Sequence, residues 1–200
     1  MITLEMLKNF GKYLELIETR LLNKYFEKQK DYIFCKEGCA ACCKYGEYPT
    51  SELELMYLVA GYQGLDKETQ DKIAVNIDNI KTGLANTDDK MYQCPFLIDN
   101  RCAVYNNRTL ICRTHGLLFY EKDKDGNLKN KMPACVNDGL NFSQVYDTER
   151  GMISPELWKA SAIEAEPVAY NISREALMNN ELTKDFGLEF GDSKRMIDWF

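Results

Sequence analysis

The chain has 200 residues, of which 45% are hydrophobic and 28% charged, and its formal net charge is -6 with a pI near 5.0. This composition is typical of a folded globular protein and argues against extended disorder. The acidic balance disfavours nucleic-acid binding, because duplex binding requires a clustered basic face. We therefore expect one domain spanning residues 1–200 and no nucleic-acid partner.

The N-terminal segment 1–17 alternates apolar and charged residues, so it lacks the unbroken apolar core of a signal peptide. No later stretch reaches the length needed to span a membrane. We expect a cytoplasmic protein without a membrane partner, and the sequence indicates no particular protein or small-molecule partner. Reducing compartments keep cysteines free for metals or catalysis, which disfavours disulfides here.

Helical periodicity dominates the first third of the chain. An amphipathic helix is predicted over residues 3–30, with apolar side chains three or four residues apart. Ser51 and Glu54 form a capping box at the start of a second helix, which Gly61 and Gly64 end. Asp66 caps a third helix that runs to Leu84. Residues 1–34 and 50–86 thus form a helical scaffold, and residues 86–90 form a loop.

Residues 91–136 lose the helical period, and turn signals separate their short apolar pieces. Asp99-Asn100 and Asp125-Gly126 predict one or two small hairpins. Helix returns in residues 150–200, where Ser154 precedes Pro155 and Ser173 can cap a shorter helix. We expect Trp199 and Phe200 to dock on the body. The predicted fold class is mainly α, with helices framing an irregular cysteine-rich lobe formed by residues 35–49 and 91–136.

Four thiols stand within nine residues, at Cys35, Cys39, Cys42 and Cys43. On a helix these side chains would share one face, and in a loop Gly38 would let the backbone turn and bring the sulfurs together. Adjacent cysteines are hard to place on one small tetrahedral ion. The adjacent pair therefore favours a cluster or two separate ions.

The remaining thiols, Cys94, Cys102, Cys112 and Cys135, are too widely spaced to form a site locally, so they must fold back onto the first set or onto each other. Thiolate-rich sites select zinc, copper(I) or iron-sulfur clusters. Zinc sites usually contain two short cysteine hooks, and only the first region contains them. Iron-sulfur ligation often adds a remote cysteine followed by proline, which Cys94-Pro95 resembles, so a 4Fe-4S cluster is favoured over zinc. All eight cysteines are candidate metal ligands.

Several neighbouring side chains suit a supporting role. Arg101, Arg108 and Arg113 flank two of the cysteines and would offset the charge of several thiolates, although surface arginines are common. The single histidine, His115, is better explained by a structural role than by ligation. Three tyrosines beside the cysteines would shield the site from water, or simply pack there: Tyr45, Tyr48 and Tyr105.

The usual catalytic signatures are absent from the sequence. It contains no glycine-rich phosphate loop, no nucleophile elbow and no paired-histidine zinc motif. A nucleophilic cysteine would need a basic partner to lower its pKa. With one histidine and eight thiols, the sequence gives little support to a catalytic cysteine. Whether the protein is an enzyme therefore stays open, and no catalytic residue is assigned.

Three segments together resemble the bacterial cysteine-cluster family of zinc- or iron-chelating proteins. They are Cys35-Lys36-Glu37-Gly38-Cys39-Ala40-Ala41-Cys42-Cys43, Cys94-Pro95-Phe96-Leu97, and the segment from Cys102 to Arg113. The resemblance covers residues 35–115 and implies a metal or iron-sulfur centre held by the matching thiols. The cluster region also resembles that of flagellin lysine methylase, which implies methyl transfer as one possible activity. No S-adenosylmethionine pocket is recognisable in this sequence. Thr109 stands where the family usually has proline, and Cys135 lies outside the matched motifs.

Three hypotheses follow from these observations. The first is an iron-sulfur protein with a redox or group-transfer role. The second is a zinc-stabilised interaction module without catalysis, in which the metal supplies folding energy. The third is metal storage or sensing.

Overall fold

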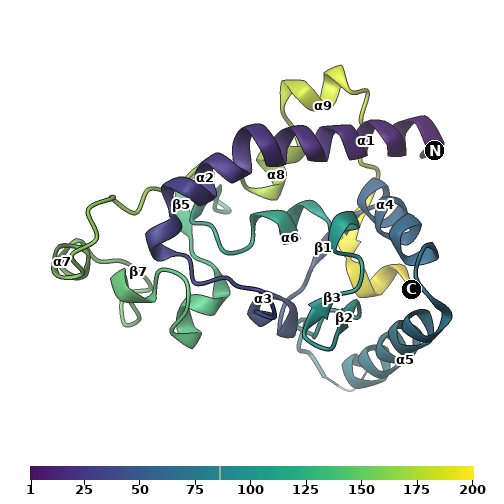
Figure 1. The fold of residues 1–200 in the computed structure, drawn as a ribbon, viewed down its shortest axis with the longest axis horizontal. Helices are drawn as coiled ribbons and strands as arrows, with labels where there is room; N and C mark the ends of the chain where they lie inside the picture. Colours follow the sequence, from purple (N-terminus) through teal and green to yellow (C-terminus); the bar gives the residue numbers. More distant parts are fainter. Residues whose placement is uncertain (86) are drawn as a thin grey trace. The chain divides into compact units, whose positions relative to one another are not determined.

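The computed structural model describes residues 1–85 and 87–200, and these divide into two compact units. Unit 1 contains Met1–Leu14, Gly38–Arg113 and Asn180–Phe200, and unit 2 contains Glu15–Glu37 and Thr114–Asn179. Figure 1 shows the elements along the chain. The single domain expected from the sequence stays a prediction, because two compact units can still unfold together. Asn86, the predicted start of a loop, lies outside the described residues.

The helices of unit 1 begin where the sequence predicts. Helix α4 (Glu52–Gln63) has the complete capping box of Ser51 and Glu54 and ends at Gly64. Helix α5 (Lys67–Leu84) begins after Asp66, whose carboxylate accepts a hydrogen bond from the Thr69 backbone. Both start points are set by local hydrogen bonds, which is why the sequence reveals them.

Short antiparallel pairs tie distant parts of unit 1 together. Strand β1 (Pro49–Ser51) pairs with β8 (Ser193–Arg195), and β2 (Leu97–Ile98) pairs with β3 (Arg101–Cys102). The chain end docks here as expected, since the Trp199 indole donates to the Thr50 carbonyl over 3.0 Å. The core of unit 1 includes buried side chains from α4, α5 and the segments beside these strands: Tyr48, Leu58, Ile73, Tyr92, Phe96, Val104, Met196 and Ile197.

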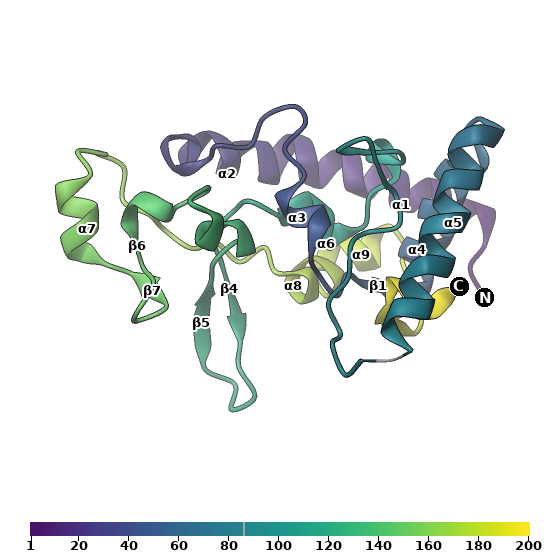
Figure 2. The ribbon, with the colours of Figure 1, turned by 90° about the horizontal axis from the view of Figure 1, so that it is seen from below.

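Helix α1 (Leu4–Ile17) opens the chain, and a π-helical turn (Glu18–Leu22) connects it to α2 (Asn23–Lys28). This confirms the long N-terminal helix. In unit 2, strand β4 (Phe119–Lys122) forms a hairpin with β5 (Leu128–Lys131), seen from below in Figure 2. The buried side chain of Gln29 joins α2 to this unit by hydrogen bonds to both backbone groups of Leu118.

The rest of unit 2 is built from short elements. Strands β6 (Tyr146–Asp147) and β7 (Met152–Ile153) pair before α7 (Pro155–Ala160), which Ser154 caps. Ser173 caps α8 (Arg174–Met178), as predicted. Helix α9 (Glu181–Asp185) belongs to unit 1. After α9, the chain forms strand β8 and ends in a 3₁₀ turn (Met196–Trp199).

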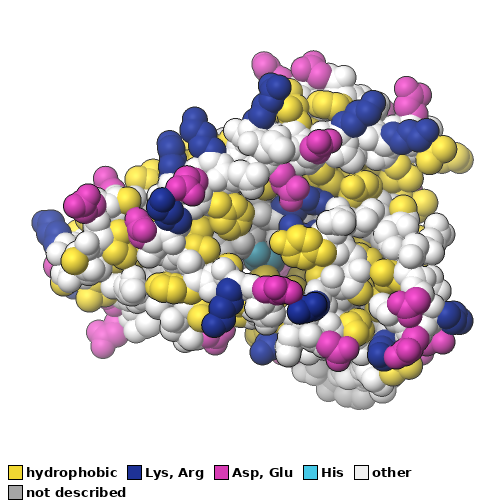
Figure 3. Space-filling model, viewed as in Figure 1, with side chains coloured by type: hydrophobic (Ala, Val, Ile, Leu, Met, Phe, Trp, Pro, Cys, Tyr) yellow, Lys and Arg dark blue, Asp and Glu magenta, His cyan; other side chains and the backbone are white. Residues whose placement is uncertain are grey.

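The mainly helical fold class with small hairpins is confirmed. The sequence left helix and loop open where α3 (Ala41–Lys44) lies, and it missed α6 (Leu110–Thr114), which is too short to show a helical period. It also missed the β1–β8 pair, whose strands are far apart in the chain. No helix among the described residues is both long and apolar enough to cross a membrane. On the face shown in Figure 3, acidic and basic side chains are interspersed.

Candidate metal centre

The adjacent cysteines of the first motif lie on α3, a single helical turn. The backbone turns before it at Gly38, whose φ of 80° favours glycine, and the Cys43 amide donates to the Ala40 carbonyl over 2.8 Å. The Sγ atoms of Cys42 and Cys43 are 3.9 Å apart. The motif therefore combines a glycine turn with a short helix, and both of the geometries that the sequence allowed contribute.

The segment after α3 pairs with the segment that carries Cys94. Gly46 and Tyr92 exchange two backbone hydrogen bonds of 3.0 Å, and the Cys94 amide donates to the Cys43 carbonyl over 2.8 Å. This pairing joins residues some fifty positions apart and brings the Cys94-Pro95 step against the first motif. The sequence analysis expected the later cysteines to fold back onto the first set or onto each other, but it could not predict which backbone groups would pair.

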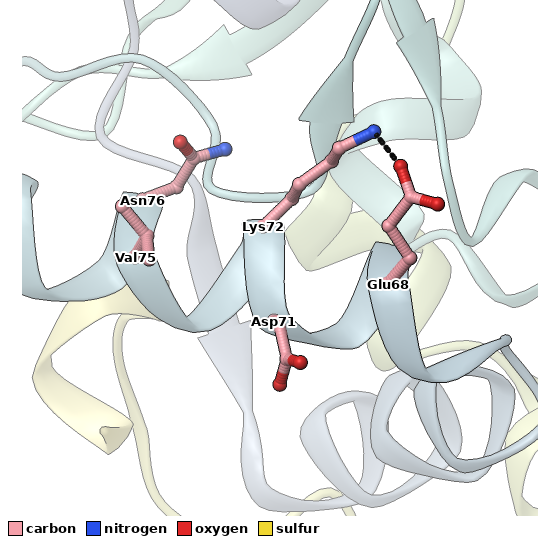
Figure 4. Close-up of a pocket in the computed structure, with 5 residues that line it drawn as sticks. All are labelled: Glu68, Asp71, Lys72, Val75 and Asn76. Atoms are coloured by element: carbon pink, nitrogen blue, oxygen red, sulfur yellow. Dashed lines mark hydrogen bonds and ion pairs between the residues drawn. The ribbon is translucent and has the colours of Figure 1, made fainter.

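Helix α5 holds the same step from its other side. The Asn76 side-chain amide donates to the Pro95 carbonyl over 3.1 Å. Figure 4 shows Asn76 beside a surface hollow lined by α5 alone, with Lys72 and Glu68 paired at 2.7 Å. The hollow contains no nucleophile or cysteine, so its role in the site is limited to the support that Asn76 gives to Pro95.

Helix α6 carries Cys112 and is positioned by a buried carboxylate. One oxygen of Glu54 accepts hydrogen bonds from the Ser51 amide and hydroxyl, while the other accepts from the Leu110 amide over 2.8 Å. The Glu54 side chain is fully buried. A single acidic side chain thus fixes the starts of both α4 and α6, and thereby the position of Cys112.

Two of the predicted arginines support the loop between Cys102 and Cys112. Arg113 is buried and donates to the carbonyls of Arg108 and Asn106 over 3.1 and 2.7 Å. Arg108 stacks on the Tyr105 ring at 3.6 Å, which is a cation–π contact. The Arg108 charge acts against the rise in pKa at the thiols of Cys42, Cys102 and Cys112. Arg101 is exposed.

The thiols of unit 1 raise one another's pKa. Burial lifts the pKa of Cys112 to about 12, and the charges of Cys102 and Cys42 add to this. Burial also raises the pKa of Cys94 well above its usual value, with further contributions from Cys112, Cys102 and Cys42. The Cys42 pKa is raised first by its contact with Cys43 and then by burial. These mutual effects place five thiols in one neighbourhood: Cys42, Cys43, Cys94, Cys102 and Cys112.

Three of these sulfurs also have hydrogen-bond donors that favour the thiolate form. A backbone hydrogen bond from Phe96 lowers the pKa of Cys94, and one from Val104 lowers the pKa of Cys102. In both cases the donor lies two residues after the cysteine. The Thr109 hydroxyl donates to the Cys112 sulfur over 3.2 Å. Donors to sulfur support metal-bound thiolates. The sequence analysis missed this role of Thr109, although a hydroxyl three residues before a cysteine at a helix start is a readable signal.

Tyr48 adds a buried hydroxyl to this neighbourhood. The side chain is 3% exposed, and its hydroxyl has no hydrogen-bond partner among the described residues. An unsatisfied buried hydroxyl costs about 1–3 kcal/mol. Thiolates can accept hydrogen bonds, so a metal centre in this position would satisfy the group. Donor set and orphaned hydroxyl therefore both fit a thiolate-held metal.

The other predicted ligands stay predictions. Cys39 is exposed in unit 1, and Cys35 and Cys135 belong to unit 2, as does His115. Within unit 2 the Cys35 sulfur accepts a hydrogen bond from the Asn141 amide over 3.2 Å. Across residues 1–85 and 87–200, no three His, Cys, Asp or Glu side chains stand as ligands around a single ion. The five thiols are thus gathered without a closed coordination geometry.

Comparison with known proteins identifies the family. The model of the CxxCxxCC family, described as "Putative zinc- or iron-chelating domain", matches residues 34–136. The chain belongs to this family. The match is longer than the motifs read from the sequence and includes all eight cysteines, Cys135 among them. No curated protein and no solved structure matches the chain.

The chain departs from the pattern in the family's name at its first interval. CxxCxxCC has two residues between the first cysteines, whereas three residues separate Cys35 from Cys39 here. The later members, Cys39, Cys42 and Cys43, keep the pattern. In this member of the CxxCxxCC family the first cysteine also lies in a different unit from the other three.

Proposed function

We propose that the protein holds a metal centre through the five thiols of unit 1: Cys42, Cys43, Cys94, Cys102 and Cys112. The observation that carries this proposal is their shared neighbourhood. The sulfurs of Cys42 and Cys43 are 3.9 Å apart, the Cys94 amide donates to the Cys43 carbonyl, and Cys43 and Cys102 pack against the core that contains Cys94. The effects of Cys112 on Cys94 and of Cys102 on Cys112 add the fifth thiol. Membership of a family described as zinc- or iron-chelating supports it. Cys39, Cys35 and Cys135 remain candidate ligands on sequence grounds.

The first form of the centre is an iron-sulfur cluster, with 4Fe-4S favoured and a redox or group-transfer role. Two features support it. Cys94 is followed by proline as in many cluster-binding sequences, and the thiolate-rich donor set suits iron-sulfur clusters. The arginines near the thiols offset the charge that a thiolate-bound cluster carries. Such a protein would work in a reducing compartment, for which we propose the cytoplasm.

The second form is zinc, in a module stabilised by metal and without catalysis. A specific distance favours it. Zinc–sulfur bonds of about 2.3 Å in a tetrahedron place sulfurs about 3.8 Å apart. The sulfurs of Cys42 and Cys43 are separated by 3.9 Å, so adjacent cysteines can take the spacing of ligands on one ion. This weakens the sequence argument that an adjacent pair disfavours a single zinc.

Anaerobic purification followed by metal and acid-labile sulfide analysis separates the two forms. A brown protein with iron and sulfide in equal amounts supports the cluster, and a colourless protein with stoichiometric zinc supports the module. In either case Cys42→Ser should lose the metal. Cys135→Ser tests the candidate ligand of unit 2 separately, because a variant that keeps its metal would confine the centre to the thiols of unit 1. Purified protein without stoichiometric metal, which cannot be loaded with either, would refute the proposal.

A further inference from the structure

Tyr48 is held in its buried position by unusual backbone features. Its φ is 49°, in the left-handed region that bulky residues rarely adopt. The ring also needs Gly46, because a Cβ there would come within 2.8 Å of the ring carbon that bears the hydroxyl. The ring packs edge-on against Tyr92, with centroids 5.3 Å apart. A strained backbone that buries a polar group indicates a constraint beyond packing.

The surroundings of the Tyr48 hydroxyl contain sulfur rather than ordinary acceptors. Tyr48 shares its core with Cys94, and Cys43 and Cys102 pack against that core. The charges of Cys94, Cys43, Cys112 and Cys42 reinforce the effect of burial in raising the pKa of Tyr48, and Cys94 contributes most. The hydroxyl is therefore buried next to cysteine sulfurs and has no other hydrogen-bond partner among the described residues.

We propose that the Tyr48 hydroxyl donates a hydrogen bond to the metal-bound thiolate of Cys94, and so acts as a positioning residue for the metal centre. The inference rests on the proposed function. Cys94 is buried, so water has little access to its thiolate. Its sulfur already has the Phe96 backbone as a donor, and Tyr48 would supply a second. The Tyr48 hydroxyl has no hydrogen-bond partner among the described residues, so it is available to donate this bond.

This role makes opposite predictions for the metal-free and metal-loaded protein. Without metal, Tyr48→Phe removes a buried hydroxyl that has no partner, so the variant should be at least as stable as the wild type. With metal, the same change removes a donor to a thiolate. A tyrosine needed only for packing would affect neither state, because phenylalanine retains the ring.

The test titrates cobalt(II) into the reduced, metal-free wild type and Tyr48→Phe. Loss of a donor beside the metal should weaken binding about 10-fold or more. It should also shift the sulfur-to-cobalt charge-transfer band to lower energy, since the thiolate becomes more electron-rich. If the native centre is an iron-sulfur cluster, the equivalent readout is a lower reduction potential in the reconstituted variant.

Tyr45→Phe is the matched control. Its hydroxyl is exposed and donates to Asp89 over 2.8 Å, and it lies three residues before Tyr48 on the same segment. This variant should keep the wild-type affinity and absorption band. Unchanged cobalt affinity and band in Tyr48→Phe would overturn the inference while leaving the proposed function intact. A metal-free Tyr48→Phe protein that melts well below the wild type would also overturn it, whether or not metal binds. Wild-type protein that binds no metal would instead refute the proposed function.

Discussion

The Thr109 hydroxyl donates a hydrogen bond to the sulfur of Cys112 over 3.2 Å. This contact gives a chemical role to Thr109, which stands where the resemblance described from the sequence has proline. Proline at this position would have no hydroxyl to donate, whereas threonine lowers the pKa of a thiol that burial otherwise raises. Substitution at position 109 is therefore a change in the chemistry of the thiol as well as in backbone stiffness.

Thr109→Val should weaken metal binding by about 10-fold, the lower end of the effect expected for a residue that hydrogen-bonds to a ligand. Valine keeps the shape but loses the donor, so the Cys112 pKa should rise further. Competition titration with a chromophoric chelator measures the affinity. Thr19→Val is the control, because the Thr19 hydroxyl donates to a helix carbonyl at an exposed position. Equal affinities for the two variants would contradict the role of Thr109.

The metal-free protein should lose stability at alkaline pH. The folded-state pKa values of Cys42, Cys94, Cys102 and Cys112 are raised above the usual 9.0, so their stabilising contribution is present below the pKa of the unfolded thiols and is lost as the pH rises. At pH 9.5 the thiols of the unfolded chain ionise more than those of the folded protein, so the free energy of unfolding should be lower than at pH 7.5. Guanidinium denaturation in the presence of reductant at pH 7.5 and 9.5 measures the loss.

Cys94→Ser should show a smaller loss than the wild type, because serine does not titrate in this range. A wild-type free energy that stays constant to pH 9.5 would contradict the raised pKa values. The metal-loaded protein should behave oppositely, with affinity falling as the pH is lowered, because protons compete for the same sulfurs. Calorimetry in buffers of different ionisation enthalpy would show proton release on metal binding.

Gly61→Ala should destabilise the protein even though alanine favours helices. A Cβ at position 61 would lie 2.6 Å from the side chain of Asn107, which donates to the Tyr57 carbonyl over 2.9 Å. Gly83→Ala in α5 is the control, since a Cβ there meets nothing within 4 Å and should stabilise by up to about 1 kcal/mol. Thermal denaturation should therefore move in opposite directions for the two variants. Equal stabilisation of both would contradict the close approach at Gly61.

Glu54→Ala should lower the free energy of unfolding by more than the loss of an ordinary helix cap does. It leaves the buried donors of Ser51 and Leu110 unsatisfied, for which we expect about 2–4 kcal/mol. Asp66→Ala removes an exposed cap and should cost about 1 kcal/mol. Chemical denaturation compares the two directly. Because Glu54 also fixes α6, its variant should bind metal more weakly, whereas a variant of Asp66 should not.

The sequence predicted those features that depend on near neighbours in the chain. The helix starts at Ser51, Asp66, Ser154 and Ser173 are confirmed because each cap is a hydrogen bond between residues two or three positions apart. The hairpin around Asp125-Gly126 is confirmed for the same reason. The short helix α6 escaped prediction and α3 was only one of two open alternatives, since one turn gives no period to detect.

The sequence by itself determined the chemistry of this protein: eight thiols in a family pattern, whose side chains can hold only soft or borderline metals. Only the tertiary structure decided which thiols meet. The Cys94 to Cys43 backbone bond, the Asn76 to Pro95 bond and the Glu54 to Leu110 bond each join residues far apart in the chain. Those bonds gather five thiols in unit 1 and leave Cys35 and Cys135 in unit 2, because ligand type is a local property and ligand proximity depends on long-range packing.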